Sequence, residues 1–345
     1  MFRGTVEVSI MEEFGSVKER EEGLVPYLTP LGAWALSVGT AIGWGSFVFT
    51  TNLYLSEAGP VGSALGMLVG MVIMLFISRN YHYLINYYPS AGGVYGYVKK
   101  IFGYDRAFLS FWYVGLAYLA MLWANATSLP LFARNFLGDT FRFGYLYTVF
   151  DYEVYLGEVL LTMAAILFMG LLCMKRERIA VNLMKVLALT FTVCIAVCFA
   201  VAMLHRDVAA FPFTPGFISG KSVLSQVTGI ALIAPWAFIG FENISHSARE
   251  FKFSHKKTFN VLTVSVVTTT LLYIFVILLS ISAIPSQYTG WPDYINRLAD
   301  QGGGLKVLPA FYAAHYYLGD TGMFLLAAAL FSLVMTSLIG NTVIA

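Results

Sequence analysis

The sequence predicts an all-α polytopic membrane protein. Of its 345 residues, 58% are hydrophobic and only 12% are charged, whereas a soluble domain carries about 25% charged residues. The apolar residues are gathered in long segments of about the 20 residues that a helix needs to cross the hydrocarbon core of a bilayer. Both observations argue against a soluble globular protein, and the absence of a basic run in the sequence gives no reason to expect a nucleic acid partner.

We expect an amino-terminal cytoplasmic segment over residues 1–28 and one membrane domain over residues 29–345. The first segment is polar and of mixed charge through Glu22, which is unlike a cleavable signal peptide. The amphipathic approach to the third span, from Gly92 to Gly103, can lie at the membrane interface. The eight predicted spans are about 31–55, 61–78, 107–132, 155–174, 183–204, 222–244, 259–284 and 322–343.

The distribution of Lys and Arg predicts the orientation of the chain in the lipid bilayer. Of the 21 Lys and Arg residues, 15 lie on the side of the membrane that holds the amino terminus, and the others lie on the opposite side. Loops rich in Lys and Arg face the cytoplasm. The sequence therefore predicts a multi-pass protein of the cell membrane with its amino terminus inside.

The first span has a glycine-rich centre, which contains Gly39, Gly43 and Gly45. Glycine is a poor helix former, so the helix is weakened at the depth of the membrane. Unwound backbone at that depth must be buried in protein or line a watery cavity. Freed amides facing a cavity would bind a small charged solute. The alternative is that Gly39 and Gly43, four residues apart, form a small face for close helix packing.

The sixth span carries a second interruption. Pro235 cannot donate a hydrogen bond to the preceding turn, and Gly240 follows five residues later. A proline kink that merely shapes a helix bundle is the alternative. However, spans 1 and 6 are the first helices of two successive five-span units, and broken helices at matching positions of two repeats predict the midplane binding site of a transporter.

Three stretches resemble the amino acid–polyamine–organocation superfamily of transporters, and within it the amino acid permeases. Residues 39–47 (GTAIGWGSF) are similar to its first-span pattern, and residues 89–97 (PSAGGVYGY) to the stretch before its third span. Residues 236–242 (WAFIGFE), running on to 248–250 (ARE), resemble its sixth-span motif. Arg249 replaces the first acidic residue of the usual ending. The resemblance covers about residues 30 to 260.

This resemblance implies the five-plus-five inverted-repeat fold first seen in a leucine transporter. That fold needs ten spans, so the expected fold is incomplete after the eighth helix. We interpret the chain as a truncated one; the alternative is an eight-span protein that cannot run a full transport cycle.

The resemblance also implies a substrate site at the two breaks, with the substrate carboxylate at the amides near Gly43 and the ammonium at carbonyls of both spans. Trp236 and Phe238 would cover the substrate, and plain core packing is the alternative for both rings. The expected substrate-binding residues are Thr40, Ala41, Ile42, Gly43, Trp44, Gly45, Trp236, Ala237, Phe238, Ile239 and Gly240.

Lys185, Glu242 and Trp236 are the candidates for coupling and gating. Lys185 matches a lysine that occupies a sodium position in some proton-coupled relatives, and its alternative is a lysine reaching the interface. Glu242 is an ionisable residue in a broken helix; alternatively, it lies in the cytoplasmic vestibule and pairs with Arg249 or His246. Asn125 on span 3 could face the substrate or bond a neighbouring helix.

We therefore expect secondary active transport of amino acids or related amines by alternating access, driven by protons or by exchange, with a sodium site left open. The two aromatic side chains hint at basic amino acids or polyamines, although backbone contacts would serve any α-amino acid. The rival hypothesis is a membrane sensor or partner subunit that binds without transport. The sequence contains no metal-ligand spacing, nucleophile motif or nucleotide loop, so no enzyme, cofactor or metal site is expected. The oligomeric state is not predicted.

Overall fold

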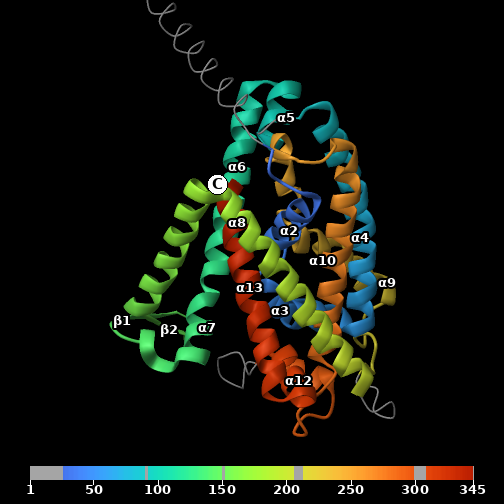
Figure 1. Cartoon of the computed structure of the whole chain (residues 1–345). Coiled ribbons are helices and arrows are strands. Elements are labelled where there is room, and N and C mark those ends of the chain that lie inside the picture. Colours follow the sequence, from blue (N-terminus) through green and yellow to red (C-terminus); the bar gives the residue numbers. More distant parts are fainter. Residues whose placement is uncertain (1–25, 90–91, 150–151, 206–212, 299–307, 345) are drawn as a thin grey trace, which may run out of the picture.

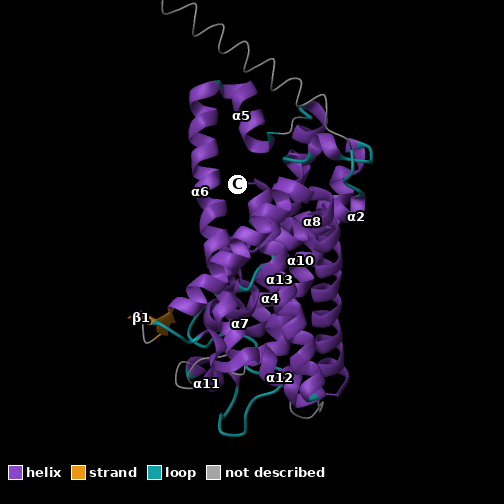
Figure 2. Cartoon of the chain, turned by 60° about the vertical axis from the view of Figure 1, so that its left-hand side comes forward, coloured by secondary structure: helices purple, strands orange, loops and turns teal. Residues whose placement is uncertain are grey.

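The computed structural model describes residues 26–89, 92–149, 152–205, 213–298 and 308–344. It is an elongated bundle of helices, and α2, α3 and α13 lie among the others (Figures 1 and 2). Most of the expected cytoplasmic segment 1–28 lies outside the described residues. Among them, six helical stretches are long and apolar enough to cross a membrane: Gly45–Tyr87, Tyr104–Phe141, Leu156–Arg176, Arg178–His205, His255–Ser280 and Asp320–Val343. The predicted all-α polytopic membrane fold is confirmed.

The first span is broken into two helices. Helix α2 (Pro30–Ala41) begins where Thr29 Oγ1 accepts a hydrogen bond from Gly32 N at 3.2 Å, which satisfies a free amide of the first turn. It ends when Ile42 becomes extended. The short helix α3 (Gly45–Phe49) and the π-helix η1 (Thr50–Leu55) then lead into α4 (Ser56–Tyr87).

The next segment approaches the membrane through a separate amphipathic helix, as the sequence indicates. This helix, α5 (Gly93–Phe102), stands beside the start of α6 (Tyr104–Ala126), the third span (Figure 1). The shorter helix α7 (Ser128–Leu137) and the 3-10 turn η2 (Gly138–Phe141) continue from α6.

A two-stranded hairpin, which the sequence did not predict, follows at the far end of α7. Strand β1 (Tyr145–Val149) pairs antiparallel with β2 (Tyr152–Tyr155), with Thr148 opposite Glu153. A nearly buried ion pair ties the region together: Arg134 Nε lies 2.5 Å from Glu158 Oε1, and the guanidinium stands 4.3 Å from the ring centroid of Tyr152.

Spans 4 and 5 are the two arms of α8 (Leu156–His205), which folds back sharply on itself (Figure 1). The bend lies at Arg176, whose backbone leaves the helical conformation. The basic residues at 175, 176 and 178 are therefore at the tip of a helical hairpin, between the two arms that the sequence predicts as separate spans.

The sixth span is interrupted as well. Helix α9 (Val223–Ile233) gives way to two 3-10 turns, η3 (Ala234–Phe238) and η4 (Phe241–Ser245). Between them Ile239 is extended and Gly240 has a φ of 98°, a left-handed conformation that glycine adopts without steric cost. The predicted break from Pro235 to Gly240 is therefore present.

The remaining elements complete the bundle. The described chain continues through the 3-10 turns η5 (Ala248–Glu250) and η6 (His255–Lys257), the seventh span α10 (Thr258–Ser280), the short helices α11 (Trp291–Asn296) and α12 (Pro309–Leu318), and the eighth span α13 (Asp320–Ile344).

Glycines allow several of these helices to approach closely. On α4, a Cβ atom at Gly70 would overlap the Cβ of Ala234 at the start of η3. On α2, a Cβ at Gly39 would stand 2.8 Å from Thr336 Cβ on α13 and 2.9 Å from Met184 Cε on α8. The close-packing alternative for the first span is thus correct for Gly39, because small residues let membrane helices come into contact.

Candidate functional site

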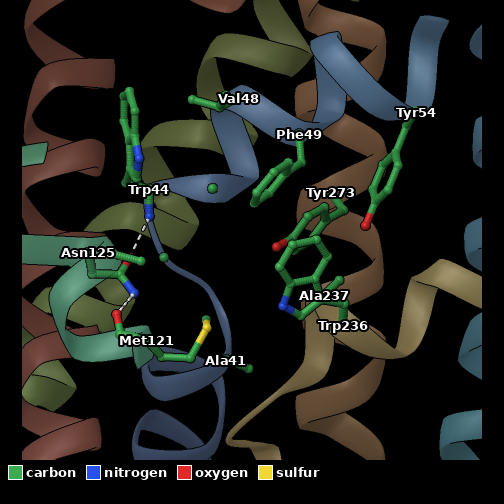
Figure 3. Close-up of a pocket in the computed structure, with 13 residues that line it drawn as sticks. Ala41, Trp44, Val48, Phe49, Tyr54, Met121, Asn125, Trp236, Ala237 and Tyr273 are labelled. Atoms are coloured by element: carbon green, nitrogen blue, oxygen red, sulfur yellow. Dashed lines mark hydrogen bonds between the residues drawn. The ribbon is translucent and has the colours of Figure 1, made fainter. Parts of the chain in front are cut away.

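A pocket of about 140 Å³ lies where the broken parts of spans 1 and 6 meet spans 3 and 7 (Figure 3). Helix α6 forms one side, and η3 and α10 form the side opposite. The lining residues are Ala41, Gly43, Trp44, Gly45, Val48, Phe49, Tyr54, Met121, Ala124, Asn125, Trp236, Ala237 and Tyr273.

Asn125 holds the broken backbone of span 1. Its Oδ1 accepts a hydrogen bond from the amide of Trp44 at 3.0 Å, and its Nδ2 donates to Met121 O at 2.8 Å. The side chain lies directly against Gly43, where a Cβ atom would overlap Oδ1 and stand 2.8 Å from Cγ. Asn125 therefore bonds the neighbouring first span, which is one of its two interpretations, and it also lines the pocket.

The pocket offers further backbone donors and acceptors. Within the described part of the chain, the amides of Gly43 and Gly45 and the carbonyls of Ala41 and Ala237 have no backbone or side-chain hydrogen bond across the breaks. Unwound backbone at this depth needs partners from protein, water or a solute. Such a site can bind a carboxylate through hydrogen bonds from amides, and an ammonium group through hydrogen bonds to carbonyls.

Aromatic side chains form the wall opposite Asn125 (Figure 3). The rings of Phe49 and Trp236 lie with centroids 4.8 Å apart, and those of Tyr54 and Tyr273 lie 6.2 Å apart. Trp236 is 46% exposed, so its ring is not a packed core residue. Instead, it covers one side of the pocket.

The structure brings six of the eleven expected binding residues to the pocket, namely Ala41, Gly43, Trp44, Gly45, Trp236 and Ala237. The expected residues that do not line it are Thr40, Ile42, Phe238, Ile239 and Gly240.

The side chains of Thr40 and Phe238 have other surroundings. The hydroxyl of Thr40 donates to Leu36 O at 2.6 Å and accepts from Asn243 Nδ2 at 3.0 Å. Phe238 is only 1% exposed, which is the core-packing alternative that the sequence left open.

Glu242 lies near the inner end of the broken sixth span and has two partners among the described residues. The hydroxyl of Tyr118 on α6 donates to Glu242 Oε1, and the amide of Gly240 donates to Oε2 at 3.1 Å. Pairing with Arg249 or His246 is therefore not observed. Arg249 Nε donates instead to Pro89 O at 3.3 Å.

Lys185 lies away from the pocket, on the second arm of α8. Its neighbour Met184 is fully buried against Gly39 of α2. Lys185 is half-buried, and in the described part of the chain it makes no hydrogen bond or ion pair.

Sequence reasoning missed the side chains that complete the pocket: Val48, Phe49, Tyr54, Met121, Ala124 and Tyr273. Most of them are ordinary apolar residues of spans, so composition gives no signal for them. Phe49 and Tyr54 follow the break within the same span, and Tyr273 is a polar-tipped ring inside an apolar run. Tyr54 and Tyr273 could have been singled out because a tyrosine hydroxyl inside an apolar run needs a polar or hydrated partner.

The comparisons with known proteins agree with this architecture. A sequence model of the family described as amino acid permease matches residues 28–345. The branched-chain amino acid permease BcaP of Bacillus subtilis (strain 168) is 24% identical over 289 residues, which are 79% of this chain and 59% of that protein. The arginine/ornithine antiporter of Latilactobacillus sakei is 25% identical over 221 residues, 61% of this chain and 43% of that protein.

The chain thus spans about half the length of the curated relatives it matches. The family assignment rests on the family model, which matches nearly the whole chain. The two interrupted helices around a pocket agree with it. The chain belongs to the amino acid permease family, within the amino acid–polyamine–organocation superfamily that its motifs resemble.

Proposed function

We propose that the protein transports amino acids or related amines across the cell membrane by alternating access. The observation that carries this proposal is the pocket between the two interrupted helices, where unpaired backbone groups stand at the depth of the membrane. A permease and an antiporter among the relatives support it, although their named substrates differ. The relatives also favour a transporter over an enzyme. The distribution of Lys and Arg supports an amino terminus on the cytoplasmic side.

The substrate carboxylate would bind the amides of Gly43, Trp44 and Gly45. The Trp44 amide donates to Asn125 Oδ1, so Asn125 stands at part of the proposed carboxylate position. Binding would then exchange one hydrogen bond for another, which keeps the amide satisfied throughout the cycle. The ammonium group would bind the carbonyls of Ala41 and Ala237.

Trp236 is the proposed gate, because a large, half-exposed ring on a short 3-10 turn can change rotamer and open or close the pocket. For the driving force we propose proton coupling or exchange. Glu242 would take part in proton coupling through its hydrogen bond with Tyr118. The ionised carboxylate accepts this hydrogen bond from the Tyr118 hydroxyl, whereas a protonated Glu242 could donate to it. Lys185, with its unpaired amine beside the packed α2–α8 contact, is the second candidate.

Uptake of labelled amino acids into proteoliposomes tests the proposal. We expect saturable uptake, and we expect Trp236→Ala to weaken apparent affinity at least tenfold. Trp123→Ala is the matched control, because Trp123 is an exposed ring on α6 outside the pocket. Binding without flux would favour the sensor hypothesis, and equal effects of both substitutions would remove Trp236 from the site.

A further inference from the structure

The pocket has two chemically different ends (Figure 3). At one end, the Trp44 amide and the Asn125 side chain stand at the broken backbone of span 1. The opposite wall is made by the rings of Phe49, Trp236 and Tyr273. A solute that fills this space would meet polar backbone at one end and aromatic carbon at the other.

In the described part of the chain, no charged side chain lines the pocket. None of the described lining residues is Asp, Glu, Lys, Arg or His. Glu242, the acidic residue nearest in sequence to the gate, does not line the pocket and is held by Tyr118 and Gly240. The only ionisable lining groups are the phenols of Tyr54 and Tyr273. A second positive charge on the substrate would therefore be desolvated without a counter-ion, which is strongly unfavourable.

From this arrangement we infer that the substrate is a neutral α-amino acid with a compact apolar or aromatic side chain. The inference rests on the proposed transport function and narrows its substrate class. The main-chain carboxylate and ammonium are met by backbone groups at the breaks, and the side chain lies against the aromatic wall. A basic amino acid or a polyamine would carry its extra charge into that wall.

The size of the pocket agrees with a compact side chain. Its volume is about 140 Å³, close to that of an engineered apolar protein cavity of about 150 Å³ that binds benzene. The pocket must hold the main-chain carboxylate and ammonium as well as the side chain, so this volume favours a short side chain. The longer side chain of arginine would need both more length and a polar partner at its end.

Aromatic rings can also attract cations, so the arrangement of these rings matters. Phe49 and Trp236 lie against each other with an interplanar angle of 37°, and part of each ring face is covered by the other. Asn125, the one amide side chain in the lining, is directed at the backbone: its Oδ1 accepts from Trp44 N and its Nδ2 donates to Met121 O. Among the described lining residues, the aromatic side of the pocket thus has no carboxylate or side-chain amide oxygen for a guanidinium group; its side-chain oxygens are the hydroxyls of Tyr54 and Tyr273.

Competition binding on the full chain in lipid nanodiscs tests this inference. L-leucine and L-phenylalanine are compared with L-arginine and L-ornithine as competitors. We expect the neutral amino acids to bind at least 30-fold more tightly, which corresponds to about 2 kcal/mol. Arginine or ornithine binding equally well or better would overturn the inference and leave amino acid transport standing. If none of the four binds, both the inference and the proposed function fail.

A pair of variants tests the position of the side chain. Phe49 is 37% exposed, so a polar side chain at this position of the wall is not fully buried. Phe49→Glu and Phe49→Gln introduce side chains of the same size that differ in their charge. We expect the ratio of arginine to leucine affinity to be at least tenfold higher in Phe49→Glu than in Phe49→Gln. Equal ratios in the two folded variants would mean that the substrate side chain does not lie against this wall, and would overturn the inference.

Discussion

Replacing Gly43 with alanine should disrupt the site through one close contact. The backbone of Gly43 is not among the positive-φ glycines, so an alanine could adopt its conformation. The obstacle is Asn125: a Cβ at position 43 would overlap Oδ1 and lie 2.8 Å from Cγ and 3.0 Å from Nδ2. All three atoms belong to the side-chain amide of Asn125, so that side chain must move.

The expected cost has two parts. Overpacking of a tight contact costs about 1–3 kcal/mol, and displacing Asn125 from the Trp44 amide leaves a buried donor unpaired, which costs about 1–3 kcal/mol. We therefore expect Gly43→Ala to lower the free energy of unfolding by about 2–6 kcal/mol. It should also weaken amino acid binding, because the displaced amide side chain would move into the pocket.

Unfolding in mixed micelles and leucine binding in nanodiscs measure the two effects. Gly229→Ala is the matched control, because a Cβ at Gly229 in α9 meets no atom within 4 Å; we expect it to be neutral or slightly stabilising. Asn125→Ala removes the opposing atoms, so the double variant should be less destabilised than the sum of the single changes, with a coupling of about 1 kcal/mol or more. A neutral Gly43→Ala, or strict additivity, would refute the reasoning.

Three further predictions concern packing and charge away from the pocket. Glu158→Ala should destabilise the chain by about 3 kcal/mol in unfolding experiments, because it removes the carboxylate partner of the partly buried Arg134 and leaves that guanidinium with only a carbonyl acceptor at Glu153 among the described residues; a change below about 0.5 kcal/mol would contradict this. In the exposed hairpin, hydrogen bonds from Tyr155 and the neighbouring guanidinium lower the pKa of Glu153. Its contribution to stability is therefore present above its unfolded-state pKa and lost as the pH falls through the lower folded-state value. Glu153→Gln should remove that pH dependence from thermal unfolding curves, and unchanged curves would count against it. Gly70→Val should prevent the close approach of α4 to the sixth span and abolish folded protein in size-exclusion chromatography, whereas a normal elution profile would show that the helices can separate.

The broken helices could be predicted from the sequence because glycine and proline act locally. Pro235 removes a backbone donor whatever surrounds it, and Gly240 permits the left-handed turn that follows. Glycine was harder to interpret in the first span, because the spacing of Gly39 and Gly43 fitted both a helix break and a small face for helix packing. The structure separates them, because Gly39 packs against α8 and α13, whereas Gly43 lies against Asn125 and lines the pocket.

The rest of the site depends on tertiary contacts that no local pattern contains. Phe49 and Tyr273 are 224 positions apart in the sequence, and only the packing of span 7 against span 1 brings them to the same wall. Phe238 and Trp236 are similar rings two residues apart, yet one is buried and the other covers the pocket. A 3-10 turn sends such neighbours in different directions, and its exact course is set by surrounding helices. The exposed hairpin was missed for the same reason, since its register depends on the pair of strands.

Substrate protection of a single engineered thiol tests the location of the site most directly. Val48 lines the pocket from α3, and the three native cysteines are buried, so a Val48→Cys variant should be alkylated selectively by a small thiol reagent. The account predicts that saturating L-leucine slows alkylation of Val48→Cys at least tenfold, and that labelling of a cysteine placed at Phe76, an exposed position on α4 outside the pocket, is unchanged. Equal rates with and without amino acid at position 48 would contradict the claim that the two broken helices enclose the substrate.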